Sequence, residues 1–315
     1  MSVERDVARA LGAEVGPGAR GGDCVPREGD RVAFSPIIER PRLAWPGGAR
    51  LAVWVVPNVE HYEYLPRQSR VRDPWPRQPH PDVLSYGLRD YGNRVGLWRL
   101  MEVLDRHEVR CTASLSLAVL EMYPEIFAAM EARSWEYMSH GLYNTRYHWN
   151  YGEDEERAAI AECVEIHRRC TGRALRGWFS PAASYTLNTP DLVAEAGIDY
   201  LCDFFHDDQP TQIKVRCGRL IGMPYSFELN DSVLHRRGQE AEDFERIGRD
   251  MFDQLALDSR RWGGLVMCIA LHPYVMGAPH RIKYLDRLLS YLKGQDGVWW
   301  STGAEIADHF IAQAR

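Results

Sequence analysis

Residues 51–58 read LAVWVVPN, and this short run of apolar and β-branched side chains decides the fold. A strand that alternates apolar and polar residues has one face in water, whereas a continuous apolar run is typical of a strand buried on both faces. A second run of this kind, LVMCIAL, occupies residues 265–271. Strands buried on both faces need helices on either side, so the two runs predict an α/β fold with a parallel sheet.

Strand-like and helix-like patterns alternate along the rest of the chain. They predict further strands near 111–117, 135–139, 174–180, 199–204, 219–223 and 298–301, and helices near 95–107, 123–133, 153–171, 189–196, 241–259 and 280–293. Residues 61–90 are polar and Pro-rich, and we expect a long functional loop there. The alternation favours a single (β/α) barrel domain at residues 46–315, preceded by a Gly-, Arg- and Pro-rich N-terminal arm at residues 1–45.

The composition limits the partners and the location of the protein. Hydrophobic residues make up 45% and charged residues 26% of the 315 residues, the balance of a soluble globular protein. A net charge of -6 argues against a nucleic-acid partner. No apolar run is long enough to span a membrane, and the N-terminal MSVERDVARA lacks the pattern of an export signal. We therefore expect a cytoplasmic protein.

Seven cysteines are scattered through the chain, an odd number that favours reduced thiols. Cys163, His167 and Cys170 would share one face of a helix by their spacing. These side chains could bind a metal, but no fourth ligand lies nearby in sequence. Free cysteine is also among the most frequently buried residue types, so we expect a buried helix face.

Reactive side chains follow the predicted strands, at the ends where an α/β barrel carries its chemistry. They are Asn58, Glu60 and His61 after the first strand, His140 and Asn144 after 135–139, Arg176 in 174–180, Asp207 and Asp208 after 199–204, and His272 after 265–271. Each alone could be structural, because carboxylates cap helices and turns and cationic side chains hold loops in place. Their shared position favours a functional site on one rim.

Three of these motifs together resemble the polysaccharide deacetylase, or NodB-homology, family: Asn58-x-Glu60, the SHG containing His140 with Asn144 four residues on, and the LHP containing His272. The resemblance spans about residues 45–312 and implies a distorted (β/α)7-type barrel, a single domain with an N-terminal extension. In that family an acidic motif supplies a base and a metal-binding Asp, a His-x3-His pair supplies two ligands, and a later His is the general acid. That last histidine is matched here by His272.

The chain departs from the family pattern at the metal ligands. The usual paired Asp is replaced by Asn58 and Glu60, and the second His of the pair by Asn144. A carboxylate, one imidazole and an amide oxygen make a poor zinc site. We therefore expect no metal or other cofactor. If a divalent metal such as zinc is bound, its ligands would be Glu60, His140 and Asn144.

Longer stretches resemble the allantoinase-like and cyclic-imide-hydrolase-like members of the family. These stretches are LRDYGNRVGLWRLMEVLDRH (88–107), HGLYN (140–144), DFFHDDQP (203–210) and LHPYVMGAPHR (271–281). Such members open a cyclic amide, ureide or imide, some of them without a metal, and they suggest a homo-oligomer. The resemblance thus implies a hydrolase of non-peptide C–N bonds with a small-molecule substrate.

Hydrolysis by an activated water needs a base, stabilisation of the oxyanion and an acid for the leaving nitrogen. We assign Glu60 as base, shared or replaced by Asp207, His272 as acid, and His140 as a hydrogen-bond donor to the carbonyl. The expected substrate-binding residues are Asn58, His61, Asn144, Arg176, Asp208 and Trp75. Two alternatives stay open: a metal-dependent N-deacetylase of an N-acetylated sugar or polysaccharide, and a non-catalytic carbohydrate- or metabolite-binding barrel.

Overall fold

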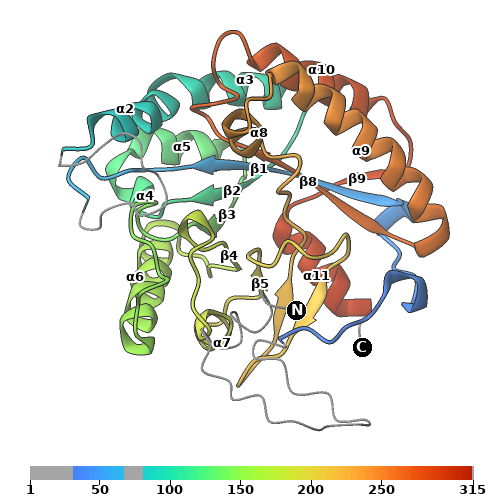
Figure 1. Cartoon of the computed structure of the whole chain (residues 1–315), viewed down its shortest axis with the longest axis horizontal. Coiled ribbons are helices and arrows are strands. Elements are labelled where there is room, and N and C mark those ends of the chain that lie inside the picture. Colours follow the sequence, from blue (N-terminus) through green and yellow to red (C-terminus); the bar gives the residue numbers. More distant parts are fainter. Residues whose placement is uncertain (1–30, 67–80, 314–315) are drawn as a thin grey trace, which may run out of the picture.

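The computed structural model describes residues 31–66 and 81–313 and shows a curved, almost wholly parallel sheet flanked by helices (Figure 1). Its strand order is β6-β7-β5-β4-β3-β2-β1-β8, and β9 pairs with the start of β1. The strands are β1 (Leu51–Val59), β2 (Thr112–Leu115), β3 (Glu136–Ser139), β4 (Gly177–Trp178), β5 (Tyr200–Leu201), β6 (Thr211–Ile213), β7 (Leu220–Gly222), β8 (Leu265–Leu271) and β9 (Val298–Trp300).

Helices form most of the connections between strands and lie mainly around the outside of the curved sheet, except the last helix, which packs with Trp54 on the concave side (Figure 1). They are α2 (Val83–Tyr91), α3 (Leu97–Arg106), α4 (Val119–Met122), α5 (Pro124–Ala132), α6 (Glu153–Thr171), α7 (Thr189–Glu195), α8 (Asp231–Arg236), α9 (Ala241–Trp262), α10 (Ile282–Lys293) and α11 (Gly303–Gln313). Among the strands of the described residues, only β6 and β7 pair in an antiparallel manner. The predicted fold class, a distorted α/β barrel in one domain, is confirmed as a half-barrel.

The central strand β1 is buried along its whole length because both of its faces are packed. Val53 and Val55 belong to the hydrophobic cluster shared with the surrounding helices. Trp54 and Val56, which point the other way, belong to a second cluster on the concave side. Burying a side chain of this size contributes about 1.5–3 kcal/mol, so β1 anchors both halves of the core. Its C-terminal end then holds Glu60 in the concave side of the half-barrel.

Part of the expected 61–90 loop is in fact the helix α2. Asp82 caps this helix by accepting a hydrogen bond of 3.2 Å from the Ser85 backbone N–H. The apolar side chains of α2, Val83, Leu84 and Leu88, are exposed, so they give no helical pattern of buried residues. The helices α8 and α11 lie outside the predicted elements as well.

Residues 31–45 lie against the half-barrel. Arg31 forms an ion pair of 2.7 Å with Asp191, and the Trp45 indole N–H donates to the Leu265 carbonyl at 2.9 Å. The division between an arm at 1–45 and a barrel at 46–315 stays a prediction, because residues 1–30 lie outside the described part of the chain. None of the helices in the described ranges has the length and apolarity that a bilayer-spanning helix requires.

The Cys163, His167 and Cys170 face of α6 is packed into the protein. Cys163 and His167 are buried, and His167 Nδ1 lies 3.2 Å from the Arg173 carbonyl oxygen. Cys170 is only partly buried. The packing of the first two side chains matches the expected buried helix face.

A close backbone contact joins the α2–α3 region to the loop that follows β8. A Cβ atom on Gly96 would lie 2.0 Å from the Pro273 carbonyl oxygen, far inside van der Waals contact. We predict that Gly96→Ala lowers the free energy of unfolding by about 3 kcal/mol, because the obstacle is backbone. The control Gly87→Ala, at an exposed helical position with open space around it, should raise the free energy of unfolding by about 0.5–1 kcal/mol. Urea unfolding of both variants measures this, and equal stabilities would contradict the proposed contact.

Candidate functional site

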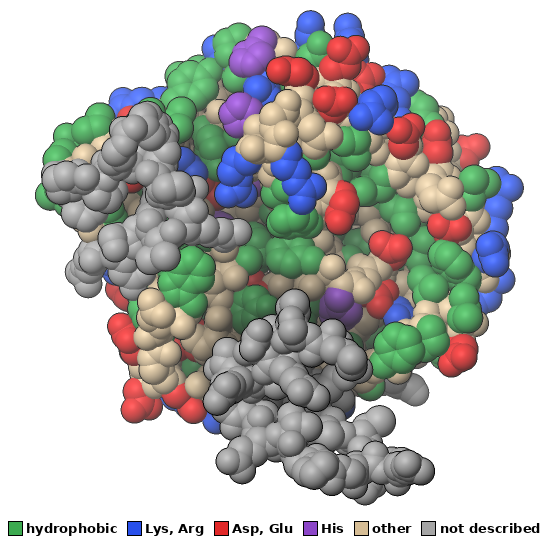
Figure 2. Space-filling model, viewed as in Figure 1, with side chains coloured by type: hydrophobic (Ala, Val, Ile, Leu, Met, Phe, Trp, Pro, Cys, Tyr) green, Lys and Arg blue, Asp and Glu red, His purple; other side chains and the backbone are tan. Residues whose placement is uncertain are grey.

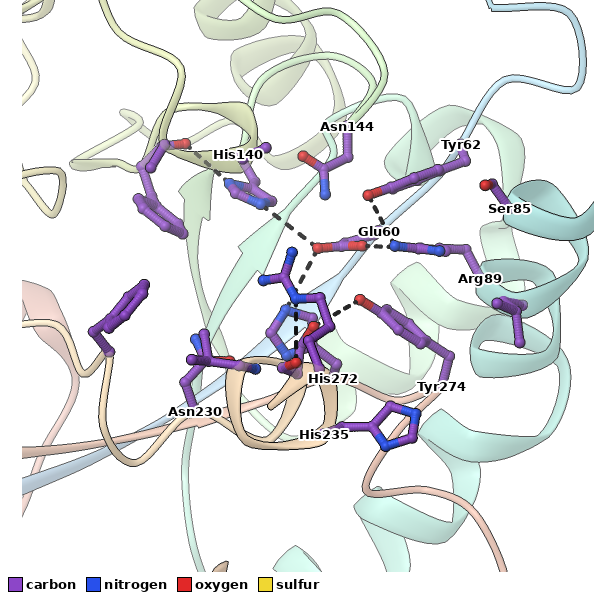
Figure 3. Close-up of a pocket in the computed structure, with 18 of the residues that line it drawn as sticks. Glu60, Tyr62, Ser85, Arg89, His140, Asn144, Asn230, His235, His272 and Tyr274 are labelled. Carbon is purple, nitrogen blue, oxygen red and sulfur yellow. Dashed lines mark hydrogen bonds and ion pairs between the residues drawn. The ribbon is translucent and has the colours of Figure 1, made fainter. Parts of the chain in front are cut away.

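A cavity of about 300 Å³ lies at the C-terminal ends of the strands (Figure 3). Its lining comes from the segments after β1, β3 and β8 and from helices α2 and α8, and Figure 2 shows a hollow on this face with cationic side chains at its rim. The polar residues that line it include Glu60, Tyr62, Arg89, His140, Asn144, Asn230, His272 and Tyr274. The aromatic side chains of Phe179, Phe205 and Tyr225 form an apolar wall.

The Glu60 carboxylate lies at the centre of the polar cluster and is 5% exposed. Its Oε1 is 3.7 Å from His140 Nε2 and 3.5 Å from His272 Nε2. Its Oε2 is 3.6 Å from Arg89 Nε. Asn93 fixes the backbone, because its side-chain N–H donates to the Glu60 carbonyl at 2.9 Å. Two imidazoles and a guanidinium thus face one carboxylate (Figure 3).

The surroundings of Glu60 keep it ionised. Burial alone would raise the pKa of this carboxyl, but the nearby His140, His272 and Arg89 outweigh burial and lower the pKa to about 2. Opposite charges within a few ångströms favour the charged form of an acid. Glu60 is therefore a carboxylate at neutral pH, able to accept a proton or to orient a water molecule.

His272 is held by Asp231, the first residue of α8. His272 Nδ1 lies 2.7 Å from one oxygen of the Asp231 carboxylate, and the other oxygen accepts the His272 backbone N–H at 2.8 Å. A hydrogen on Nδ1 is therefore donated to Asp231, and Nε2 faces Glu60 and the cavity. A carboxylate that fixes the orientation of an imidazole in this way is a common feature of catalytic histidines.

His140 is fixed through the other edge of its ring. Nδ1 lies 3.1 Å from the Phe179 carbonyl oxygen, which can only accept, so Nδ1 carries a hydrogen. The imidazole stacks on the Phe179 ring with 4.7 Å between the centroids. Nε2 is left facing Glu60, and the ring has little freedom to turn.

Arg89 is a site residue that the sequence patterns did not single out. It lies on α2, and its Nη2 donates to the Tyr62 hydroxyl at 3.0 Å. Its guanidinium also lies over the rings of Tyr62 and Tyr274, at 3.9 and 4.4 Å from the centroids. Aromatic faces stabilise a desolvated cation, so the tyrosines hold Arg89 beside Glu60. The sequence patterns did not indicate Asp231 either, because it lies outside every predicted helix and strand.

Of the expected substrate-binding residues, Asn144 lines the cavity, and it is 2% exposed. Asn58 does not line it: its side-chain N–H groups donate to the Tyr225 hydroxyl at 2.8 Å and to the Leu271 carbonyl at 3.1 Å. It therefore joins β1 to β8 as a structural residue. His61 is also directed elsewhere, with Nδ1 3.0 Å from the Tyr123 hydroxyl.

The two aspartates expected at this site lie elsewhere. Asp207 forms an ion pair of 2.6 Å with Arg40 and, with Asp208, lines a separate hollow of about 390 Å³ between β7 and β8. Burial raises the pKa of Asp208. The chain after β5 leaves the rim to form β6, an edge strand, and takes both side chains with it. The structure therefore places Asp207 outside the cavity that contains Glu60, contrary to the expected position.

Arg176 is also not part of the cavity. It precedes the two residues of β4, at the opposite end of the strand, and forms ion pairs of 2.6 Å with Asp199 and with Asp308. A structural salt bridge accounts for it. Trp75 lies outside the described residues.

The donor set of the cavity does not fit a zinc ion. Within the described ranges, no group of three or more His, Cys, Asp and Glu side chains is placed to hold a metal. Arg89 lies 3.6 Å from one Glu60 oxygen, and a cation there competes electrostatically with a divalent ion. An amide at position 144 in place of an imidazole weakens the set further.

The buried Asp203 gives a test of the electrostatics around this site. Burial raises its pKa from 3.8 to about 6, although the Ser180 backbone N–H at 2.9 Å and the Ser180 hydroxyl at 2.7 Å both donate to it. Between about pH 4 and 6 the folded protein keeps a proton that the unfolded chain has lost, so the free energy of unfolding should fall as pH rises, by about 3 kcal/mol in all.

We predict that this fall disappears in Asp203→Asn, whose side chain cannot titrate. Urea unfolding of the natural protein and of the variant from pH 4 to 7 measures it. The difference between the two free energies should change through that window; parallel curves would show that Asp203 titrates alike in both states.

Comparison with known proteins agrees with these motifs. The sequence model of the family described as Polysaccharide deacetylase matches residues 86–201. A putative polysaccharide deacetylase of Schizosaccharomyces pombe is 26% identical, over 89% of this chain and 95% of that protein. A peptidoglycan deacetylase of Helicobacter pylori is 22% identical, over 73% of this chain and 88% of that protein.

Solved structures share the whole fold. PuuE allantoinase superposes with a TM-score of 0.79 at 26% identity, over 92% of this chain and 98% of that one. A probable polysaccharide deacetylase from Pseudomonas aeruginosa PAO1 gives a TM-score of 0.77 at 26% identity, over 89% of this chain and 98% of that one. With its half-barrel, its strand-end motifs and these matches, the chain is similar to the polysaccharide deacetylase, or NodB-homology, family in both sequence and fold.

Proposed function

We propose that this protein is a hydrolase that opens a cyclic amide, ureide or imide by attack of water on a ring carbonyl. The observation that carries the proposal is the ionised Glu60 carboxylate, held between His140, His272 and Arg89 at one side of a small cavity. The likeness to PuuE allantoinase over nearly the whole of both chains supports the reaction class.

In the proposed reaction Glu60 accepts a proton from water while the water oxygen bonds to the carbonyl carbon. In this proposal both imidazoles carry a hydrogen on Nε2 as well as on Nδ1, and the His140 Nε2–H and the Asn144 amide N–H donate to the oxygen on which negative charge develops. The intermediate then collapses, the ring C–N bond breaks, and His272 donates its Nε2 proton to the departing nitrogen, which leaves this ring neutral. The products are a carboxylic acid and an amide or urea nitrogen on one open chain.

The proton that Glu60 has taken must return to His272. Glu60 Oε1 lies 3.5 Å from His272 Nε2, so one small movement brings the two atoms into hydrogen-bond contact. Asp231 holds the imidazole in this position throughout. The same pair of side chains can therefore act as base and acid in every turnover.

The basicity of Glu60 limits how unreactive the carbonyl group of the substrate can be. With a pKa of about 2, Glu60 is fully ionised but is a weak base. A weak base suffices for a carbonyl that is already electrophilic and a nitrogen that leaves readily, as in imides and ureides. An acetamide needs stronger activation, which a metal supplies in many hydrolases.

The cavity volume supports a small substrate. About 300 Å³ is at the lower end of small-molecule sites, and aromatic side chains form one wall. The alternative, a metal-dependent N-deacetylase acting on an N-acetylated sugar or polysaccharide, is favoured by the names of two relatives. It requires a metal that these donors do not fit.

A panel of substrates distinguishes ring opening from metal-dependent deacetylation and from binding without catalysis. Allantoin, hydantoin, succinimide, phthalimide and an N-acetylated chitooligosaccharide would each be incubated with the protein, with and without a strong chelator, beside the Glu60→Gln variant. We expect ring opening that survives the chelator and falls at least about a thousandfold in Glu60→Gln. Deacetylation abolished by the chelator would establish the alternative, and binding without turnover a non-catalytic barrel.

The role of Asp231 gives a second prediction. Asp231→Asn removes the carboxylate that accepts the His272 Nδ1 hydrogen, so the imidazole loses its fixed orientation. We expect kcat for ring opening to fall at least about a hundredfold with little change in KM. Glu242→Gln, an exposed change at the start of α9, is the control and should leave both constants unchanged. An unaltered kcat in Asp231→Asn would remove His272 from the role of acid.

The homo-oligomer and the cytoplasmic location stay predictions. Sedimentation analysis of the purified protein would measure the first, and fractionation of the source cells the second.

A further inference from the structure

We propose that Asn144 selects the substrate by forming two parallel hydrogen bonds with the –NH–C(=O)– edge of a ring. The inference rests on the proposed ring-opening function and narrows it. The substrate class is a cyclic imide, ureide or lactam whose ring nitrogen carries a hydrogen. An N-substituted ring and an open-chain acetamide would be excluded.

The Asn144 side chain is buried and has no hydrogen-bond partner among residues 31–66 and 81–313. It is 2% exposed, and its carbonyl oxygen accepts no hydrogen bond. Its amide nitrogen makes no hydrogen bond within the described part of the chain either. By contrast, its backbone N–H is satisfied by the His61 carbonyl at 3.1 Å, so the residue is held in place.

The side chain is directed at the reactive groups. Asn144 lines the cavity together with Glu60 and His140, and Figure 3 shows its amide beside the His140 ring, directed toward Glu60 from the side opposite His272. Buried polar groups in native proteins are nearly always hydrogen-bonded, and an orphaned one needs an explanation. A ligand that supplies both a donor and an acceptor would satisfy the amide.

The geometry of an amide side chain then selects the shape of that ligand. A primary amide presents one acceptor and one donor side by side. In a small ring the amide bond is forced to be cis, so its N–H and C=O lie on the same edge and can meet both groups at once. In the N-acetyl group of a sugar the amide is trans. Its N–H and C=O then point in opposite directions, and only one of them can reach Asn144.

This edge contact agrees with the proposed reaction. Both hydrogen bonds lie in the plane of the ring, so they leave its two faces open to the attacking water and to His272. The Asn144 N–H bond to the carbonyl strengthens as negative charge develops on that oxygen.

The test compares succinimide with N-methylsuccinimide in three proteins. The natural protein should prefer succinimide by about 10–100-fold in kcat/KM, the effect of leaving one buried polar group unpaired. Asn144→Leu, which keeps the branching of the side chain but has no polar atom, should lose about that factor on succinimide alone, so that the preference falls to about threefold or less. Thr145→Val is the control, because Thr145 is buried and its hydroxyl donates to Glu63 at 2.7 Å, outside the cavity. It should keep the preference.

A second measurement does not depend on any variant folding. Inhibition of the natural protein by 2-pyrrolidinone, a cis lactam, is compared with inhibition by N-methylacetamide, a trans amide with the same groups. We expect the lactam to inhibit at concentrations at least about tenfold lower. Equal inhibition, or an unchanged preference in folded Asn144→Leu, would overturn the role of Asn144 while ring opening by the natural protein still stood. Absence of any ring opening would overturn the proposed function and this inference together.

Discussion

Burying the charge of Glu60 is costly unless other charges surround it, and the arrangement of the site follows from that constraint. Three separate parts of the fold supply the neighbours: His140 after β3, His272 after β8 and Arg89 on α2. Each neighbour is in turn held by a partner of its own, a carbonyl, a carboxylate or a pair of aromatic rings. The Glu60 carboxylate is therefore surrounded by three nitrogen-containing side chains, and each of these is held in turn by its own partner.

Much of the fold follows from buried strands and regular helices. The runs at β1 and β8 and the long helix α6 have patterns strong enough to predict, because their side chains face the core in a regular order. Helix α2 has no such pattern, since Ser85 is its one fully buried residue and its apolar side chains are exposed. Periodic apolar residues indicate which face of a helix is buried. Helix α2 lacks such a pattern because its N-cap and the polar contacts of the site stabilise it instead.

The same distinction explains which site residues could be predicted. Glu60, His140 and His272 each follow a predicted strand. The carboxyl ends of parallel strands lie on the same side of the sheet, so the predicted fold is enough to place these three residues together. Asp207 follows β5, a strand of two residues, and the chain there turns away to form β6. Arg89 and Asp231 come from helices after long connections, where no local pattern indicates which way a side chain points.

The contact between Gly96 and Pro273 links two of these parts through backbone alone. Arg89 precedes Gly96 by two helical turns, and His272 is next to Pro273. Main-chain packing between Gly96 and Pro273 therefore fixes the distance between Arg89 and His272 on the two sides of Glu60. Beyond Asp231, by contrast, α8 ends in the exposed His235 and Arg236 at the cavity mouth. The half-barrel thus has two parts: a packed core around Gly96 and Pro273, here called the frame, which holds the reactive side chains, and the exposed end of α8, here called the wall, which lines the cavity mouth. Adapting this scaffold to a ring of another size would begin at that wall, with the frame left as it is.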